Sequence, residues 1–426
     1  MDERCAETLE ADAGVPSRNR WILPANVFTR KLWNRRHSDR VRDVSIVGLG
    51  QIAVGEQWDK SLRVMGAEAV LASLRDAGLE RPEALYVGNM LSGQVSRQEN
   101  LGALIADHAG LRGIEAVKVE GACASGAAAL RLAYIAVAGG VHDIVAACGV
   151  EKMTDALSEE TTAALVSAAD AIYEGEHGLS FVALNALLMR RYMHEYGYQR
   201  QDFAGFAINA HKNAVSNPYA MFRRVISAEA FARAKMIADP VSLLDSSAIA
   251  DGAAAVVLAP TEYARAHGLK AVRVVGSAIA TDAVALHDRN DLLFLQAAHL
   301  SAQRAYAQAG LGPQDVDFFE LHDAFTIMSA LSLEAAGFAE RGQGVRLAME
   351  NEISLQGRIP ICTMGGLKAR GHPVGASGLY QVVEAAEQLR GEAGANQLQG
   401  CRVGMTQSIG GSGALVVTHL LERVNC

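Results

Sequence analysis

Short apolar runs alternate with amphipathic stretches from about residue 43 onward, and this alternation constrains the fold of the 426-residue chain more than any other feature. In the first half we expect strands over residues 44–50, 84–88, 116–120, 143–149 and 253–258. A helix is expected over residues 61–77, where Gly78 ends the pattern. Strands that alternate with helices predict an α/β sheet covered by helices.

The same order of elements returns in the second half. There we expect strands over residues 272–279, 316–321, 401–405 and 414–421, and helices over 292–309, 324–336 and 379–389. The repetition predicts a duplicated fold, with the strand-to-helix corners at Cys123 and His322 equivalent and facing a shared cleft. Open α/β sheets bind ligands at the carboxyl ends of their strands.

Two stretches depart from this pattern. Residues 1–42 carry a basic cluster without a clear period, which indicates a disordered or partner-binding arm, or a segment upstream of the true start. Residues 154–240 lack strand signals and are rich in helix formers, which predicts an inserted helical and loop region with a binding role. The predicted division is thus a first half over 43–265, which contains the insertion, and a second half over 266–426.

Charge and cysteine content narrow the function. The net charge of −8 argues against a body that binds nucleic acid. The six cysteines show no CxxC pair, which favours free thiols in a reducing compartment over disulfides or a metal site. No apolar run reaches the length of a membrane span, and the first nine residues do not resemble a signal peptide, so we expect a cytoplasmic protein.

Cys123 lies where an apolar run meets a helix of small residues. The N–H groups and dipole of a helix N-terminus favour a thiolate, the form of cysteine that acts as a nucleophile. A cysteine among alanines and glycines is more often a small buried apolar residue, so this segment alone leaves both roles open.

Two glycine-rich segments add candidate groups. Residues 364–378 hold His372 before Pro373, in a loop that precedes a helix, and a rigidly held histidine is a candidate base. Residues 406–413 contain the pair Gly410 and Gly411, whose N–H groups suit an oxyanion or a phosphate, or else form a tight hairpin. No GxGxxG or Walker pattern opens a βαβ unit, which argues against nucleotide binding by those routes.

At this point four segments, in order, resemble the thiolase superfamily. They are Glu120-Gly-Ala-Cys-Ala-Ser-Gly126, His322-Asp-Ala-Phe325, the run from Gly365 to Gly378 with its Gly-His-Pro-Val-Gly-Ala-Ser-Gly, and Ser408-Ile-Gly-Gly411. The resemblance spans roughly residues 43–423. It implies a five-layer αβαβα fold of two similar halves and acyl-CoA thioesters as substrates, with no further cofactor. It also implies an acetyl-CoA C-acyltransferase that forms or cleaves a 3-ketoacyl-CoA through an acyl-cysteine.

The resemblance also implies roles for individual residues. Cys123 is the nucleophile and His372 the group that deprotonates it. The N–H groups of Cys123 and Gly410 form an oxyanion hole. Weaker matches place His177 and Ser180 along the pantetheine of bound coenzyme A and Ser247 in another segment of the substrate pocket, although each also fits a plain polar loop residue.

Two departures from the ordinary thiolase pattern leave one proton transfer unassigned. His322-Asp-Ala-Phe325 stands where Asn-Glu-Ala-Phe is usual, as in sterol-carrier-protein-type and archaeal thiolases. Ser408 occupies the position of the usual second cysteine, and serine is a poor general base. His322 acting through a water, or Cys362 near the glycine-rich loop, are the candidate substitutes, although Cys362 also fits a buried strand-end thiol.

Two other functions fit the same residues. The set Cys123, His322 and His372 also resembles ketoacyl synthases, which condense after decarboxylation and need no α-proton abstraction. Relatives with the His-Asp-Ala-Phe pattern also work as subunits beside a synthase-like protein and an OB-fold partner. By resemblance, the chain is expected to form a homodimer or homotetramer.

Overall fold

The computed structural model describes residues 41–424. The predicted N-terminal extension over 1–42 lies outside the described residues except for its last two positions.

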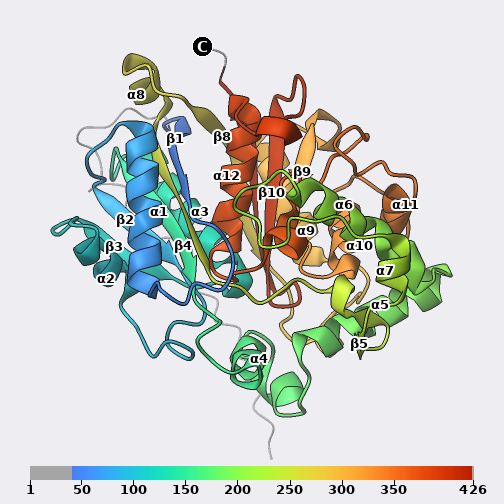
Figure 1. Ribbon diagram of the computed structural model, residues 1–426. Helices are drawn as coiled ribbons and strands as arrows, with labels where there is room; N and C mark the ends of the chain where they lie inside the picture. Colours follow the sequence, from blue (N-terminus) through green and yellow to red (C-terminus); the bar gives the residue numbers. More distant parts are fainter. Residues whose placement is uncertain (1–40, 425–426) are drawn as a thin grey trace, which may run out of the picture. The chain divides into compact units, whose positions relative to one another are not determined.

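Nine strands form one mixed sheet in the order β3-β2-β4-β7-β1-β8-β11-β10-β9 (Figure 1). The strands are β1 Val44–Gln51, β2 Ala84–Gly88, β3 Glu115–Val119, β4 Val145–Glu151, β7 Gly252–Pro260, β8 Val272–Thr281, β9 Phe318–Glu320, β10 Val403–Gly410 and β11 Leu415–Arg423. A separate two-stranded ribbon consists of β5 Met236–Ala238 and β6 Val241–Ser242.

The sheet is built from two similar halves that meet at β1 and β8. Only two residue pairs join these strands, Ser45 with Arg273 and Ile46 with Val272. Outward from this joint the order is β1-β7-β4-β2 on one side and β8-β11-β10-β9 on the other, which confirms the predicted duplication. The order also makes β9 the counterpart of β2 and not of β3. The predicted equivalence of the corners at Cys123 and His322 is therefore wrong.

β3 has only a remnant as its counterpart in the second half. There Phe319 of β9 forms an isolated parallel bridge with Ile361, and the backbone N–H of Phe319 donates to the carbonyl of Pro360. The edge of the second half is thus covered by residues 360–362. Among the described residues, β3 pairs with β2 alone.

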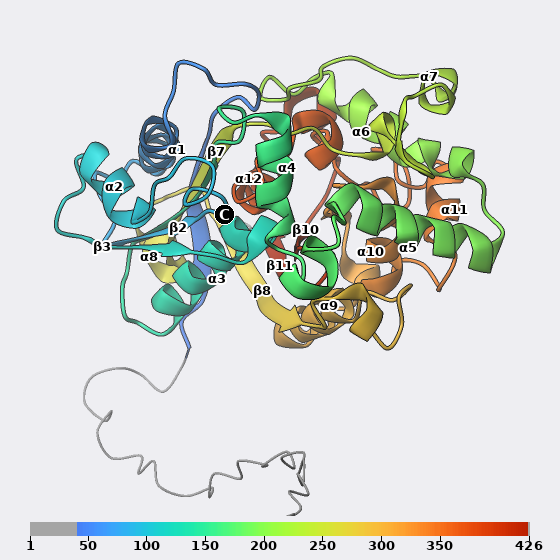
Figure 2. The ribbon, with the colours of Figure 1, turned by 90° about the horizontal axis from the view of Figure 1, so that it is seen from below.

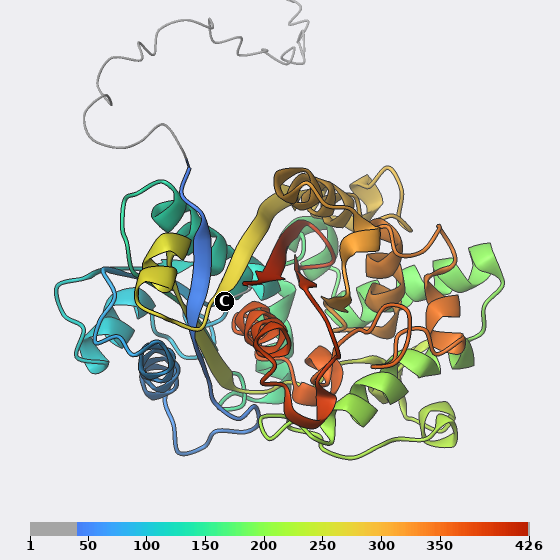
Figure 3. The ribbon, with the colours of Figure 1, turned by 90° about the horizontal axis from the view of Figure 1, so that it is seen from above.

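Helices complete five layers (Figures 2 and 3). The helices are α1 Leu62–Ala77, α2 Leu101–His108, α3 Ser125–Ala138, α4 Ser158–Val166, α5 Phe181–Tyr196, α6 Ala204–Ala214, α7 Ala228–Ala232, α8 Thr261–Ala266, α9 Gln296–Ala309, α10 Thr326–Ala335, α11 Gly344–Met349 and α12 Ser377–Arg390. α1 and α2 cover the strands of the first half, and α9 with α10 behind it covers those of the second. α3 and α12 pack on each other and contact strands of both halves, so they form the central layer.

Local sequence explains most of these boundaries. Gly78 and Gly310 end α1 and α9 with φ of 65° and 68°, a left-handed conformation that glycine adopts without strain. The insertion is largely helical as predicted, with α4 to α7 and the β5–β6 ribbon. α2 was not predicted, because eight residues carry too little periodicity to stand out.

The second glycine-rich segment forms a hairpin. β10 extends to Gly410, five residues beyond the predicted strand end, because residues 406–410 continue to pair with β11. The turn between these two strands contains Gly411, Ser412 and Gly413. The predicted hairpin is confirmed, and its strands contact the short turn before α3 that contains Cys123.

Candidate active site

Cys123 lies in a short 3₁₀ turn, Ala122–Ala124, directly before α3. Ala122 has a φ of 53°. This left-handed conformation is strained for any residue that carries a Cβ atom. Ser125 ties the turn together, because its Oγ accepts from the N–H of Gly121 at 3.0 Å and donates to the carbonyl of Ala122 at 2.6 Å. Strained turns that are held in this way cluster at functional sites.

The thiol of Cys123 is 8 % exposed and packs in an apolar cluster that includes Met90, Leu91, Met153 and Val374. Burial, with the charge of Glu151 as a smaller cause, raises the pKa of Cys123 to about 12. The N–H groups of Gly411 and of Cys123 itself lower that pKa, but by less. The N–H groups at the helix terminus favour the thiolate, as expected, but burial outweighs them and keeps the resting thiol protonated. A base must accept the proton.

His372 is held in the tautomer that a base requires. Its Nδ1 lies 2.7 Å from Oγ of Ser377, and that hydroxyl donates to the carbonyl of Pro373 at 3.0 Å. The hydroxyl therefore accepts from Nδ1–H, which leaves Nε2 with a free lone pair. Burial, with the nearby His322 and Arg370, holds the pKa of His372 well below its usual value, so the ring is neutral.

His322 has the opposite tautomer. The N–H of Ile409 donates to its Nδ1 at 3.3 Å, so Nε2 carries the proton. Burial lowers the pKa of His322 to about 3, with Arg370 as a smaller cause. The two imidazole rings lie 5.2 Å apart between centroids and meet edge to face. The structure thus brings together one histidine that accepts a proton and one that donates a hydrogen bond.

A strap over residues 246–249 links the two histidine segments. Ser246 bridges to Phe325, and Ile249 bridges to His372. The N–H of Ser247 donates to the carbonyl of Ala324 at 2.8 Å, within the His322 segment. Ser247 therefore lies beside the histidine pair, and its side chain is half-buried.

Ser408 is buried in β10 and faces α12. Its Oγ donates to Oε1 of Gln381 at 2.5 Å. The amide nitrogen of Gln381 donates in turn to the carbonyls of Glu320, Leu321 and Gln407. The hydroxyl proton of Ser408 is thus used in a hydrogen-bond network that connects α12 to the strand ends beside His322. Ser408 therefore has a positioning role.

Cys362 is buried under the His322 segment, where it does not suit proton transfer. Burial raises the pKa of its thiol well above the usual value, and the carboxylates of Asp323 and Glu320 raise it further. A thiol in these surroundings stays protonated. The structure supports the prediction of a buried strand-end thiol.

The hairpin turn brings the N–H of Gly411 near enough to Cys123 to lower the pKa of its thiol. Gly410 is the last residue of β10 and lies against Gly121, since a Cβ on Gly410 would come 2.5 Å from the carbonyl oxygen of Gly121. The assignment of the Gly410 and Cys123 N–H groups to an oxyanion hole stays a prediction.

Glu151 and Asn89 are two buried polar residues of this site that the sequence analysis missed. Glu151 ends β4, and Asn89 follows β2 directly. The amide of Asn89 donates to Oε1 of Glu151 at 2.7 Å. The sequence signal that could have identified both residues is the one that indicated Cys123, namely a polar side chain at the carboxyl end of an apolar strand.

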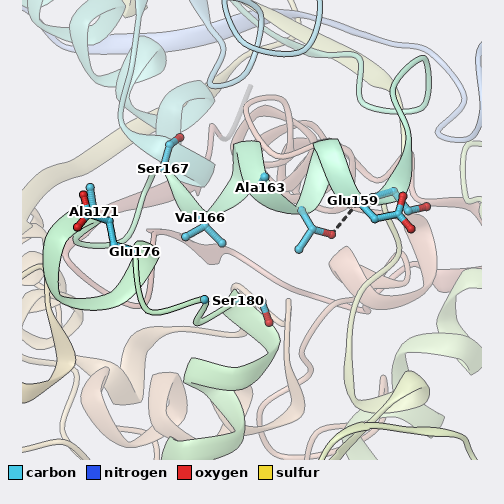
Figure 4. A pocket seen from close by; sticks show the side chains of 11 residues that line it. Glu159, Ala163, Val166, Ser167, Ala171, Glu176 and Ser180 are labelled. Carbon is cyan, nitrogen blue, oxygen red and sulfur yellow. Dashed lines mark hydrogen bonds between the residues drawn. The ribbon is translucent and has the colours of Figure 1, made fainter.

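Cavities lie beside this centre. The larger, about 710 Å³, lies between α4 and the start of α5 (Figure 4). Ser180 lines it, whereas His177 is exposed and does not. A second cavity of about 330 Å³ shares Ser167 with the first and includes Met90, which packs against Cys123.

Within residues 41–424, no helix has the length and apolar character needed to cross a membrane. The same part of the chain contains no cluster of histidine, cysteine, aspartate and glutamate able to hold a metal ion. The four cysteines in it, Cys123, Cys148, Cys362 and Cys401, are free and buried.

Comparison with known proteins gives a consistent result. Residues 44–262 match the family model described as thiolase, N-terminal domain, and residues 278–423 match the one described as thiolase C-terminal domain-like. An acetyl-CoA acetyltransferase of Methanothermobacter thermautotrophicus is 45 % identical over 90 % of this chain and 100 % of its own length. Human sterol carrier protein 2 is 31 % identical over 89 % of this chain and 72 % of its own length.

A solved structure of the Ltp2-ChsH2(DUF35) aldolase superposes with a TM-score of 0.78, at 25 % identity over 89 % of this chain and 98 % of that one. The two family models together span most of the chain, and the fold agrees with them. The chain belongs to the thiolase family.

Proposed function

We propose that this chain is an acetyl-CoA C-acetyltransferase that works through an acetylated Cys123. The observation that carries the proposal is the histidine pair in opposite tautomers, together with a buried thiol on a strained turn. The 45 % identity to an acetyl-CoA acetyltransferase along its full length supports the choice of substrate.

In the first step, Nε2 of His372 takes the proton of the Cys123 thiol as the sulfur attacks the thioester carbonyl. The new carbon–sulfur bond forms, and the bond to coenzyme A breaks. The departing thiolate takes the proton back from His372 and leaves as the thiol. N–H groups at Cys123 and at the Gly410–Gly411 turn stabilise the oxyanion between these events.

In the second step, His322 and His372 divide the work on a second acetyl-CoA. Nε2–H of His322 donates to its carbonyl oxygen, while the free Nε2 of His372 removes a proton from the neighbouring carbon. The enolate carbon attacks the acetyl group on Cys123, and the carbon–sulfur bond breaks. The Cys123 thiolate recovers the proton from His372, and a 3-ketoacyl-CoA is released. His372 serves both steps because the hydroxyl of Ser408 donates to Gln381 and the thiol of Cys362 stays protonated.

Mass spectrometry of the intact protein and its peptides after incubation with acetyl-CoA tests the nucleophile. We expect an acetyl adduct on Cys123 that is absent from Cys123→Ala, and a rate of its formation lower by about 10²- to 10⁴-fold in His372→Asn. Cys401→Ala is the matched control, since it removes a buried thiol outside this site. An adduct on another cysteine would overturn the assignment.

The missing second cysteine favours one other reaction, a decarboxylating condensation that needs no α-proton abstraction. Malonyl-CoA and acetyl-CoA offered separately as the second substrate distinguish the two. Product from malonyl-CoA only would support the ketosynthase-like alternative and exclude the second step above.

Partner dependence is the remaining alternative. It is supported by the similarity to the chain of the Ltp2-ChsH2(DUF35) aldolase, whose name includes a second protein. An OB-fold or synthase-like partner would then be needed for turnover. If the purified chain forms the acetyl adduct alone, the acylation step needs no partner.

Assembly and location complete the proposal. A homodimer through the exposed edge strand β3 is favoured by the exposure of that strand, and a cytoplasmic location by the free cysteines.

A further inference from the structure

Glu151 is a buried carboxylate that the mechanism above does not use. Both of its oxygens accept hydrogen bonds from two N–H donors each. Oε1 accepts from the Asn89 side chain at 2.7 Å and from the N–H of Leu91 at 3.1 Å. Oε2 accepts from the N–H of Met90 at 2.9 Å and from that of Gly375 at 3.0 Å. These N–H donors favour the anion, but burial outweighs them and raises the pKa of Glu151 to about 7, so the carboxylate is charged above that pH.

These partners are the segments that enclose the thiol. The side chains of Met90, Leu91 and Val374 pack on Cys123, and Glu151 holds the backbone at Met90, at Leu91 and at Gly375, next to Val374. One carboxylate thus joins the loop after β2 to the loop that carries His372. The two loops are more than 280 residues apart in the sequence.

The approach at Gly375 leaves no room for a side chain. A Cβ there would lie 2.6 Å from Oε2 of Glu151 and 2.7 Å from the Cα of Asn89. The glycine three residues after His372 is therefore required for contact with Glu151.

Resting on the proposed role of Cys123, we propose that Glu151 is a positioning residue for acyl transfer: its carboxylate sets the His372 loop against the thiol and brings its negative charge near the sulfur. The charged groups that face the thiol are Glu151 at the end of β4 and Glu120 after β3. The loop of His372 also packs against Cys123 through Val374, and the His372 ring is neutral because its pKa is lowered. Lys118 acts on Glu151 from β3.

A set of variants distinguishes the effect of the charge of Glu151 from the effect of its side-chain length. Glu151→Gln removes the charge and presents an amide to N–H donors. Glu151→Asp keeps the charge but shortens the reach, and Gly375→Ala disturbs the contact from the other loop. Glu334→Gln is the matched control, since Glu334 is a buried carboxylate in α10 that accepts bonds from Tyr192 and Gly344.

Two measurements on the full chain are needed, both at about pH 8.5, where Glu151 is charged because its pKa is about 7. The first is the rate of acetylation of Cys123 by acetyl-CoA, which we expect to fall at least tenfold in all three variants at Glu151 and Gly375 and to change less than twofold in Glu334→Gln. The second is the ratio of alkylation rates of Cys123 by anionic iodoacetate and neutral iodoacetamide, located by peptide mass spectrometry. We expect this ratio to rise about fivefold in Glu151→Gln alone.

A loosened site speeds both reagents alike and leaves their ratio unchanged, so the ratio reports charge and not exposure. A wild-type ratio or a wild-type acetylation rate in Glu151→Gln would overturn the inference. Failure of the wild-type chain to acetylate Cys123 would instead overturn the proposed function, because the reagent ratio does not depend on acetyl-CoA.

Discussion

At the scale of single residues, Cys123 and His372 were accessible from the sequence because each lies in a segment of rare composition. Their protonation states were not accessible. The thiol is neutral because tertiary burial raises its pKa, and the tautomer of His372 depends on Ser377, which in turn donates to Pro373. Glu151 escaped notice since its partners come from distant segments.

Ser408 provides a test at this scale. Its hydroxyl donates to Gln381 and is not free to act as a base, so Ser408→Ala is expected to acetylate Cys123 within a few-fold of the wild-type rate. The variant leaves Oε1 of Gln381 without that donor, which lowers the free energy of unfolding by about 1–3 kcal/mol. Acetylation kinetics and urea denaturation measure the two effects. A large loss of acetylation in a stably folded variant would contradict the conclusion that the Ser408 hydroxyl takes no part in acetylation.

At the scale of elements, the strands and the glycine-ended helices could be predicted because their signals are local in sequence. The order of strands in the sheet could not, since hydrogen bonding between β9 and β10 leaves no local trace. For that reason the corner at His322 was matched with the wrong strand of the first half.

His419 connects β11 to the central helix α3. Its Nε2 lies 3.2 Å from the carbonyl of Ala127, and burial lowers its pKa to about 4. In the unfolded chain its pKa is near 6.5, so between pH 6.5 and 4 the unfolded state binds the extra proton. The stability that neutral His419 contributes is complete above pH 6.5 and is lost as the pH falls toward 4.

Removal of this titration is expected to flatten the pH dependence. In His419→Gln, the free energy of unfolding falls less steeply with acid than in the wild type, by about 1.4 kcal/mol per pH unit within that window. Chemical denaturation at pH 4.5, 5.5, 6.5 and 7.5 measures the difference between the two proteins. Other buried groups titrate in both proteins, so their contributions cancel in the difference between the two free energies of unfolding. Parallel profiles would show that His419 does not titrate on unfolding.

At the scale of the whole molecule, the proposed dimer is tested at the sheet edge. Val117 lies in β3 with 45 % of its surface exposed. Val117→Asp places a charge there, which is expected to convert the homodimer to a monomer in light scattering after gel filtration. The exposed Ile237→Asp, in the β5–β6 ribbon, is the control. A dimer that survives Val117→Asp would place the interface elsewhere.

The duplication is imperfect in one place, and that difference limits how copies can assemble. One end of the nine-stranded sheet offers β3, while the other is covered by residues 360–362. A chain with two open edges can add copies without limit, as in a filament. A chain with one open edge can only meet the same edge of another copy, which closes the assembly about a two-fold axis. In the proposed homodimer, the short bridge at Phe319 would block the second edge and so limit sheet extension to two chains.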